Sequence, residues 1–252
     1  TITLGGYAAS ASGIALLDDD DVDTEQVIVF NTPNLIMEGD SCTTDLNIDN
    51  CVPESAVRGI WFQNADFSQV GIAQFTGSGN TRGIESTVPL SFSGATSVTM
   101  SGFCVGGTNC LGVRLLEAIT GSATTTLNLN AQTDTNFHNQ GINIVDVVSM
   151  GDVIVDVDAQ AFRGFIFNGN LQATSLTITS VLSACDDECF AVVMRGDINV
   201  SGGDVIIQSV SPVAGVVIGS NTVDDQFIAD YLTITHAGPA TTVPLTVRRS
   251  GI

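Results

Sequence analysis

The sequence contains no lysine and only seven arginines, against 27 aspartates and glutamates, so its formal net charge is −20. A chain with this charge is repelled by nucleic acid and by anionic membrane surfaces, because binding a phosphate backbone requires many cationic side chains. We therefore expect no nucleic-acid partner. The charge suits a solvated surface in saline or divalent-rich surroundings, and solubility alone explains it equally well.

Long apolar runs and helical periodicity are also missing. No stretch reaches the roughly 18 consecutive apolar residues of a membrane-spanning helix, so we expect no membrane insertion. No window keeps an apolar stripe at helical spacing, so helices should be few. Aromatic residues make up only 6% of the chain and glycine contributes 26 residues, which favours a narrow core of stacked Ile, Val and Leu.

A short segment recurs along most of the chain. Its clearest example is Arg58-Gly59-Ile60-Trp61-Phe62, and in each copy a Gly, Ala or Pro serves as the anchor position. Successive anchors are 23 to 29 residues apart. Repeats of this size indicate a solenoid, a propeller or another array. The anchors are Gly59, Gly83, Gly112, Gly141, Gly164, Ala191, Gly215 and Pro244.

A second series of short β-branched runs lies 12 to 17 residues after the anchors. Apolar and variable residues alternate in these runs, as is typical of strands with one buried face. A leucine-rich repeat would need a helical half, and a propeller blade needs about 40–50 residues. The pattern predicts an all-β parallel solenoid of about eight to ten coils, each with two or three strands. The runs begin at Val98, Leu127, Val153, Leu176, Val205 and Leu232.

We expect residues 1–252 to form a single β-solenoid domain, since β-rich chains of this length often do. Residues 1–57 hold less regular coils. There Val27–Phe30 is the predicted second strand, and Asn31–Val57 is assigned to an insertion with a cysteine loop. Residues 58–247 hold the regular coils, and 248–252 an incomplete one.

The first residues of the chain read as a second strand, and the last apolar run reads as an anchor strand with no second strand after it. Strand edges exposed at both ends are normally capped or paired. Either the residues belong to a longer β-helix, or one subunit continues the coil of the next. We expect the latter, a homopolymer built by end-to-end stacking. The predicted assembly ends are Thr1, Ile2, Thr3 and Leu4 at one terminus and Leu245, Thr246 and Val247 at the other.

The six cysteines fall as three local pairs, and in a solenoid only near neighbours can meet. A zinc site is the rival interpretation, but no second half with His or Cys at zinc spacing accompanies these pairs. Disulfides that hold protruding loops indicate an oxidising, exported location, so we expect an extracellular or cell-surface protein. The predicted pairs are Cys42 with Cys51, Cys104 with Cys110, and Cys185 with Cys189.

The repeats resemble those of right-handed parallel β-helix proteins, which include pectate-lyase-like folds and many secreted or surface-anchored repeat proteins. The resemblance covers nearly the whole chain, at the level of repeat pattern only. It implies right-handed winding, which is also the general hand of parallel crossovers. The resemblance also implies two alternatives: the protein could be a carbohydrate-active enzyme (polysaccharide lyase or hydrolase), or an adhesin or tail-fibre-type binding module.

The motifs of the enzymes with this fold are incomplete in the chain. Polygalacturonase-like enzymes carry an Asn-Thr-Asp segment, an Asp pair, a Gly-His-Gly and an Arg-Ile-Lys, and only residues 221–225 loosely match the first two. Paired carboxylates can act as acid and base, but adjacent aspartates in a turn point different ways. Arg163 and Arg195 are available for lyase chemistry. Because arginine recurs beside the anchor at Arg58, Arg82 and Arg163, we interpret it as an outward ladder that offsets acidic neighbours, and expect no catalytic residue.

No cofactor is expected, and one weak metal candidate remains. Ca²⁺ prefers several oxygen ligands, which the densest acidic run could offer. That run lacks the spaced pattern of a calcium loop, so a solvated turn is the favoured interpretation. His138 and His236 are isolated in the sequence and suit turn or surface roles. The metal candidates are Asp18, Asp19, Asp20 and Asp21.

The middle residue of each second strand should point outward. A regular threonine column would suggest ice binding, but isoleucines interrupt it, and exposed isoleucine favours a surface packed against a partner or a covering segment. This column is Thr99, Asn128, Ile154, Thr177, Ile206 and Thr233.

The sequence therefore favours a secreted structural solenoid, not an enzyme, that builds an extracellular fibre. The enzyme alternative predicts a long groove lined by clustered carboxylates. The adhesin alternative predicts a monomer or trimer with a saturable ligand such as a glycan.

Overall fold

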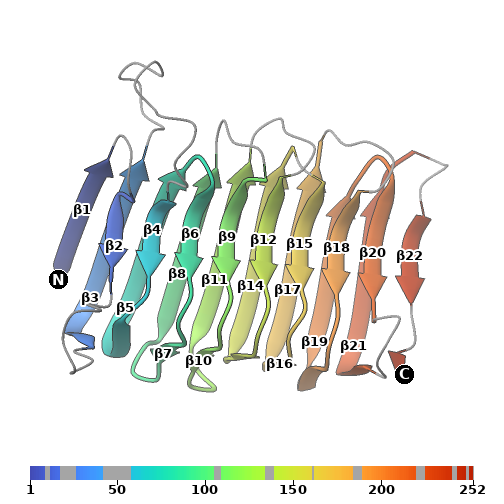
Figure 1. Cartoon of the computed structure of the whole chain (residues 1–252). Helices are drawn as coiled ribbons and strands as arrows, with labels where there is room; N and C mark the ends of the chain where they lie inside the picture. The colour runs from blue at the N-terminus through green and yellow to red at the C-terminus, as the bar shows by residue number, and fades with distance from the viewer. Residues whose placement is uncertain are drawn as a thin grey trace.

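Parallel β-strands make up most of the described chain, and the described residues contain no helix. The strands lie side by side in chain order from the N-terminal end of the molecule to the C-terminal end (Figure 1). The structure is a computed structural model. It describes residues 1–8, 12–17, 27–41, 58–104, 109–133, 139–160, 162–183, 189–219, 225–239, 243–247 and 250–251.

The recurring anchor segments form one nine-stranded parallel sheet, here called the anchor sheet. Each strand pairs with the corresponding strand of the next repeat, so that Arg58 lies opposite Arg82 and Ile60 opposite Ile84. In every repeat, the residues on either side of the anchor pair with the residues on either side of the next anchor. This pairing confirms the predicted spacing. The strands are β2 (Ile14–Leu16), β4 (Arg58–Phe62), β6 (Arg82–Ser86), β9 (Leu111–Leu115), β12 (Gln140–Ile144), β15 (Arg163–Phe167), β18 (Phe190–Met194), β20 (Ala214–Ile218) and β22 (Val243–Val247).

The second series of runs forms a longer parallel array, here called the long face. Its register is the predicted one, since Leu127 lies opposite Val98 on one side and opposite Val153 on the other. The strands are β1 (Ile2–Ala8), β3 (Ile28–Ser41), β5 (Ala65–Gly79), β8 (Ser97–Cys104), β11 (Thr126–Thr133), β14 (Asp152–Ala159), β17 (Ser175–Leu182), β19 (Ile198–Val210) and β21 (Asp225–Ala237).

A third, shorter array is here called the short face. Along the chain, its strands lie between a strand of the anchor sheet and the next strand of the long face. Its strands are joined to the long face through β19, whose Ile198 pairs with Leu171. The described chain is thus an all-β arrangement of long parallel sheets, consistent with a parallel β-solenoid. The strands of the short face are β7 (Leu90–Phe92), β10 (Ile119–Gly121), β13 (Val148–Ser149) and β16 (Leu171–Gln172), and β23 (Ser250–Gly251) pairs with the start of β21.

The N-terminal repeat differs from its prediction. Ile28 and Val29 lie opposite Ala65 and Asp66, at the start of β5, whereas the position of a second strand is taken by Leu35, which lies opposite Ala73. Assigning Val27–Phe30 to the second strand was therefore wrong, and so was assigning all of Asn31–Val57 to an insertion. Both runs are apolar and both have residues that pair with β5. Only the register, which continues from Leu35 through Ala73 to Val98, shows which run lies at the position of a second strand.

Inward residues of the three faces share one apolar core. Along β14, exposed and buried residues alternate, as expected for a strand with one buried face. Near the N-terminal end the core is aromatic, with ring centroids 5.1 Å apart for Phe62 and Phe75 and 5.2 Å apart for Phe67 and Phe92. This aromatic part of the core departs from the predicted ladder of aliphatic residues.

The anchor sheet and the long face approach each other closely along one edge. A Cβ atom on Gly83 would lie 2.5 Å from the backbone nitrogen of Phe103, and one on Gly102 would lie 1.9 Å from the carbonyl oxygen of Gly112. Both distances are far below van der Waals contact. Glycine recurs at these positions because a residue without a side chain lets the two backbones approach this closely.

Candidate functional site

The C-terminal face of the molecule leaves inward-pointing residues uncovered. Leu232 of β21 is 45% exposed, whereas Val205, its partner one strand earlier, is fully buried. Leu245 of β22 is 41% exposed, whereas its partner Val216 is 1% exposed. These side chains continue the core columns of the solenoid, and they are exposed because none of the described strands packs over them.

At the opposite end of the array lies β1 (Figure 1), and the N-terminal face there also exposes an inward residue. Ile2 of β1 is 37% exposed, whereas its partner Leu35 is fully buried. Leu4 and Ile14 are partly buried and pack against the core. Apolar residues are therefore exposed on both outer faces of the described array of strands.

The two end faces are complementary in residue type. The paired registers place Ile2 and Leu232 in one inward column of the long face, and Leu4 and Ile234 in the next. The registers of the anchor sheet likewise place Ile14 and Leu245 in one column. A second copy with β1 over β21 and β2 over β22 would stack aliphatic residues on aliphatic residues in every one of these columns.

A disulfide joins Cys104, at the end of β8, to Cys110, just before β9, with Cα atoms 5.8 Å apart. This is one of the three predicted pairs. Cys189 is also disulfide-bonded. Its predicted partner Cys185, and both members of the pair Cys42 and Cys51, lie outside the described residues.

Replacing both Cys104 and Cys110 with alanine should lower the free energy of unfolding by about 2 kcal/mol, because the crosslink closes a short loop in the unfolded chain. Urea denaturation of the variant and of the wild type measures this difference. Equal denaturation midpoints would contradict the expectation.

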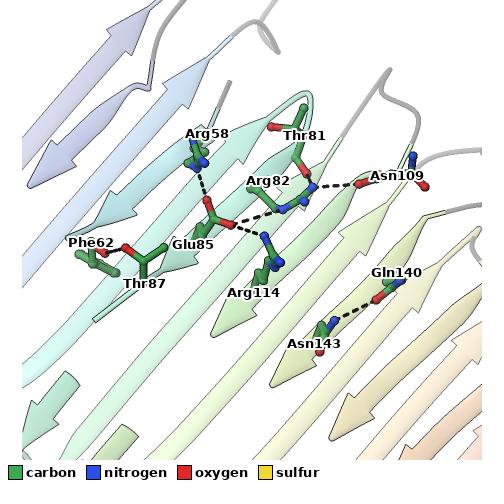
Figure 2. A network of polar contacts seen from close by, with 10 residues as sticks. All are labelled: Arg58, Phe62, Thr81, Arg82, Glu85, Thr87, Asn109, Arg114, Gln140 and Asn143. Atoms are coloured by element: carbon green, nitrogen blue, oxygen red, sulfur yellow. Dashed lines mark hydrogen bonds and ion pairs between the residues drawn. The ribbon is translucent and has the colours of Figure 1, made fainter. Parts of the chain in front are cut away.

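Three arginines converge on one buried carboxylate on the outer side of the anchor sheet (Figure 2). The side chain of Glu85 is only 2% exposed. Arg58 forms an ion pair with it through Nε. Arg114 donates from a terminal nitrogen to Glu85 Oε1 at 2.8 Å, and Nε of Arg82 lies 3.7 Å from the same oxygen. The cluster links three neighbouring strands, β4, β6 and β9.

Further contacts orient these side chains. Arg82 donates to the carbonyl oxygens of Thr81 and Asn109 at 2.6 and 2.9 Å. Burial lowers the pKa of the Arg82 guanidinium below its ordinary value; Glu85 acts to raise that pKa, and the two neighbouring arginines act to lower it. The guanidinium carbon of Arg58 lies 4.0 Å from the ring centroid of Trp61, a cation–π contact.

The predicted arginine ladder is only partly present. Arg58 and Arg82 are neighbours and share an acidic partner, as expected. Arg163 is not part of this group, because Leu111 and Gln140 occupy the positions between it and Arg82. Instead its guanidinium carbon lies 4.6 Å from the ring centroid of Phe162. The register thus places all three arginines in one column, as predicted, but only Arg58 and Arg82 are adjacent in it.

Sequence reasoning missed Glu85, Arg114 and the position of Trp61 beside them. All three lie two residues after an anchor glycine, and the pairing of β4, β6 and β9 sets them in one row. Alignment on the anchors could therefore have found them as an outward row of polar and aromatic residues.

The other sequence candidates are not brought together. Residues 18–21 and His138 lie outside the described residues, and so do positions 221–224 of the loose polygalacturonase match. No group of three or more His, Cys, Asp or Glu that could hold a metal occurs within the described ranges. Arg195 follows β18, and its backbone N–H donates to the carbonyl oxygen of Phe167 at 2.7 Å. His236 lies on β21 with Nδ1 3.0 Å from Oγ of Ser209.

The outward column of the long face is confirmed by the register, which pairs its six predicted members in sequence from β8 to β21. Ile154 is 40% exposed within it. Beside this column lies a shallow hollow of about 240 Å³, lined by Phe103, Asn130, Gln132, Asp156 and Asp158 among others.

Comparisons of the chain with family models, curated proteins and solved structures gave no match. The resemblance to parallel β-helix proteins therefore rests on the repeat pattern and on the parallel sheets. In the described part of the chain, no helix is long and apolar enough to cross a membrane.

Proposed function

We propose that this chain is a structural β-solenoid, right-handed and with about eight to ten coils, that assembles end to end into an extracellular fibre. The observation that carries the proposal is the complementarity of the two end faces. Each exposes inward aliphatic residues, and the registers place these residues in shared columns.

Hydrophobic burial and backbone pairing would both favour stacking. Fully burying one Leu, Ile or Val side chain contributes about 1.5–3 kcal/mol, and several such residues lie on each face. The outer edges of β1 and β21 would in addition pair their backbone groups, as strands do within the long face. Stacking would thus cover the surfaces and strand edges that the end faces leave open.

Two further features suit an exported fibre. The disulfide between Cys104 and Cys110 supports an oxidising location. The net charge of −20 would keep finished fibres apart in solution, because like-charged surfaces repel each other.

Leu232→Asp should abolish fibres, because its carboxylate would be buried without a partner in the stacked interface. We expect roughly a hundredfold weaker association or more, since an unpaired buried charge costs several kcal/mol. Negative-stain electron microscopy and sedimentation velocity over a range of protein concentrations measure the effect. The residue is 45% exposed in the single chain, so the variant should still fold.

Thr233→Asp is the matched control, since it places the same carboxylate on the same strand but on the outward side. This variant should assemble like the wild type. Deleting Thr1–Leu4 removes the opposite face and should also abolish polymerisation. Monomeric wild type at high concentration, or fibres of Leu232→Asp indistinguishable from those of the wild type, would refute the proposal.

A further inference from the structure

The arginine cluster around Glu85 carries an excess of positive charge. Three guanidinium groups surround one carboxylate, which leaves a local net charge of about +2 at neutral pH. The chain as a whole is strongly acidic, with a formal net charge of −20. The three arginine side chains are 22%, 19% and 32% exposed, so solvent and small solutes reach them.

The cluster also has more hydrogen-bond donors than Glu85 can accept. An arginine carries five N–H donors, whereas a carboxylate offers about four acceptor positions. Beside Glu85 in the ladder lies Trp61, whose buried Nε1–H has no hydrogen-bond acceptor among the described residues. A buried donor without an acceptor is costly, and the indole ring that carries this one lies against the guanidinium of Arg58. Arg82 also donates to the carbonyl oxygens of Thr81 and Asn109, and the remaining donors leave room for a further, negatively charged acceptor.

We propose that Arg58, Arg82, Arg114 and Trp61 form a binding site for a small divalent oxyanion such as sulfate or hydrogen phosphate. A dianion balances the excess charge of the cluster, and the forked guanidinium groups bind planar or tetrahedral oxyanions through paired hydrogen bonds. The indole N–H adds a neutral donor. Bound here, the anion would relieve the repulsion among the three arginines and tie β4, β6 and β9 together more firmly.

The negative charge of the whole molecule favours binding of a small anion over binding of a polyanion. A polyanion such as a sulfated polysaccharide would extend from the cluster onto acidic surface and be repelled there. A single oxyanion needs only the cluster itself. The site does not depend on stacking of the end faces, so it exists in the single chain.

Trp61 is the only tryptophan of the chain, so its fluorescence reports directly on the site. Sodium sulfate is titrated into the wild type at constant ionic strength, with sodium chloride as the balancing salt. We expect a saturable change in Trp61 emission. Arg114→Gln, which removes the most exposed of the three charges, should weaken sulfate binding about tenfold, the loss typical of one charge-assisted hydrogen bond.

Arg195→Gln is the matched control, because it makes the same substitution at an arginine that follows β18, several strands away. It should bind sulfate like the wild type. Arg114→Lys keeps the charge and should bind with intermediate affinity, which separates lost binding from a disturbed fold. A response that does not saturate, unchanged affinity in Arg114→Gln, or tighter binding of dextran sulfate per sulfate group would each overturn the proposal.

Discussion

Glu85→Gln should lower the free energy of unfolding by roughly 3 kcal/mol. The carboxylate is buried at 2% exposure, and it is the acidic partner of Arg58, Arg82 and Arg114. An amide keeps the shape of the side chain but removes the charge, so three close guanidinium groups would repel each other without compensation. Because these groups are 19–32% exposed, solvent screening places the loss near the lower end of the range for broken buried pairs.

Chemical denaturation of Glu85→Gln and of the wild type measures the difference. Glu117→Gln is the matched control, because Glu117 is exposed in the turn after β9, and the same substitution there should change stability by less than about 0.5 kcal/mol. Added salt should restore part of the loss in Glu85→Gln by screening the arginines. Equal stability of the two variants would show that Glu85 does not hold the cluster together.

Gly102→Ala should destabilise the protein by at least about 2 kcal/mol, although it adds a single methyl group. The new Cβ would lie 1.9 Å from the carbonyl oxygen of Gly112 and 2.8 Å from a side-chain carbon of Val113. The first of these neighbours is backbone, so it cannot move aside as the end of a flexible side chain can. The long face would have to separate from the anchor sheet at this edge, which opens the core beside it.

Gly5→Ala is the control for this substitution. Gly5 lies on β1 of the same long face, and a Cβ there would meet nothing within 4 Å. Alanine at this position should leave stability unchanged or raise it slightly, since it reduces the freedom of the unfolded chain. Thermal unfolding of both variants provides the measurement. A Gly102→Ala variant as stable as Gly5→Ala would mean that the two sheets do not approach each other as closely as described.

Sequence periodicity determined the repeat and its register. Gly59, Gly83 and Gly112 recur where two sheets meet, and the runs beginning at Val98 and Leu127 recur where a strand buries one face. These are local requirements that every repeat must satisfy with its own residues, so they leave a visible period. A slip of one residue would turn each buried side chain to solvent, which is why pattern and register agree.

The short face and the N-terminal repeat were less accessible to sequence reasoning. Strands such as β13 and β16 contain only two residues each, too few for an alternating pattern. Val27–Phe30 and Leu35–Met37 are both apolar, and only the register that continues from β5 to β8 distinguished them. The sequence of a short apolar segment does not show which of its residues point inward or which residues they pair with. Only the neighbouring strand determines its register.

The contacts that suggest function were decided by tertiary structure alone. Glu85 meets Arg58 and Arg114 only because strands 27 and 29 residues away in the chain lie beside it. The end faces likewise combine β1 with β2 and β21 with β22, elements that belong to different sheets. A repeat pattern determines which residues point inward, because burial acts on each residue separately. Which charges meet, and which apolar columns stay open, depends on how the sheets stack, since that stacking brings distant residues together.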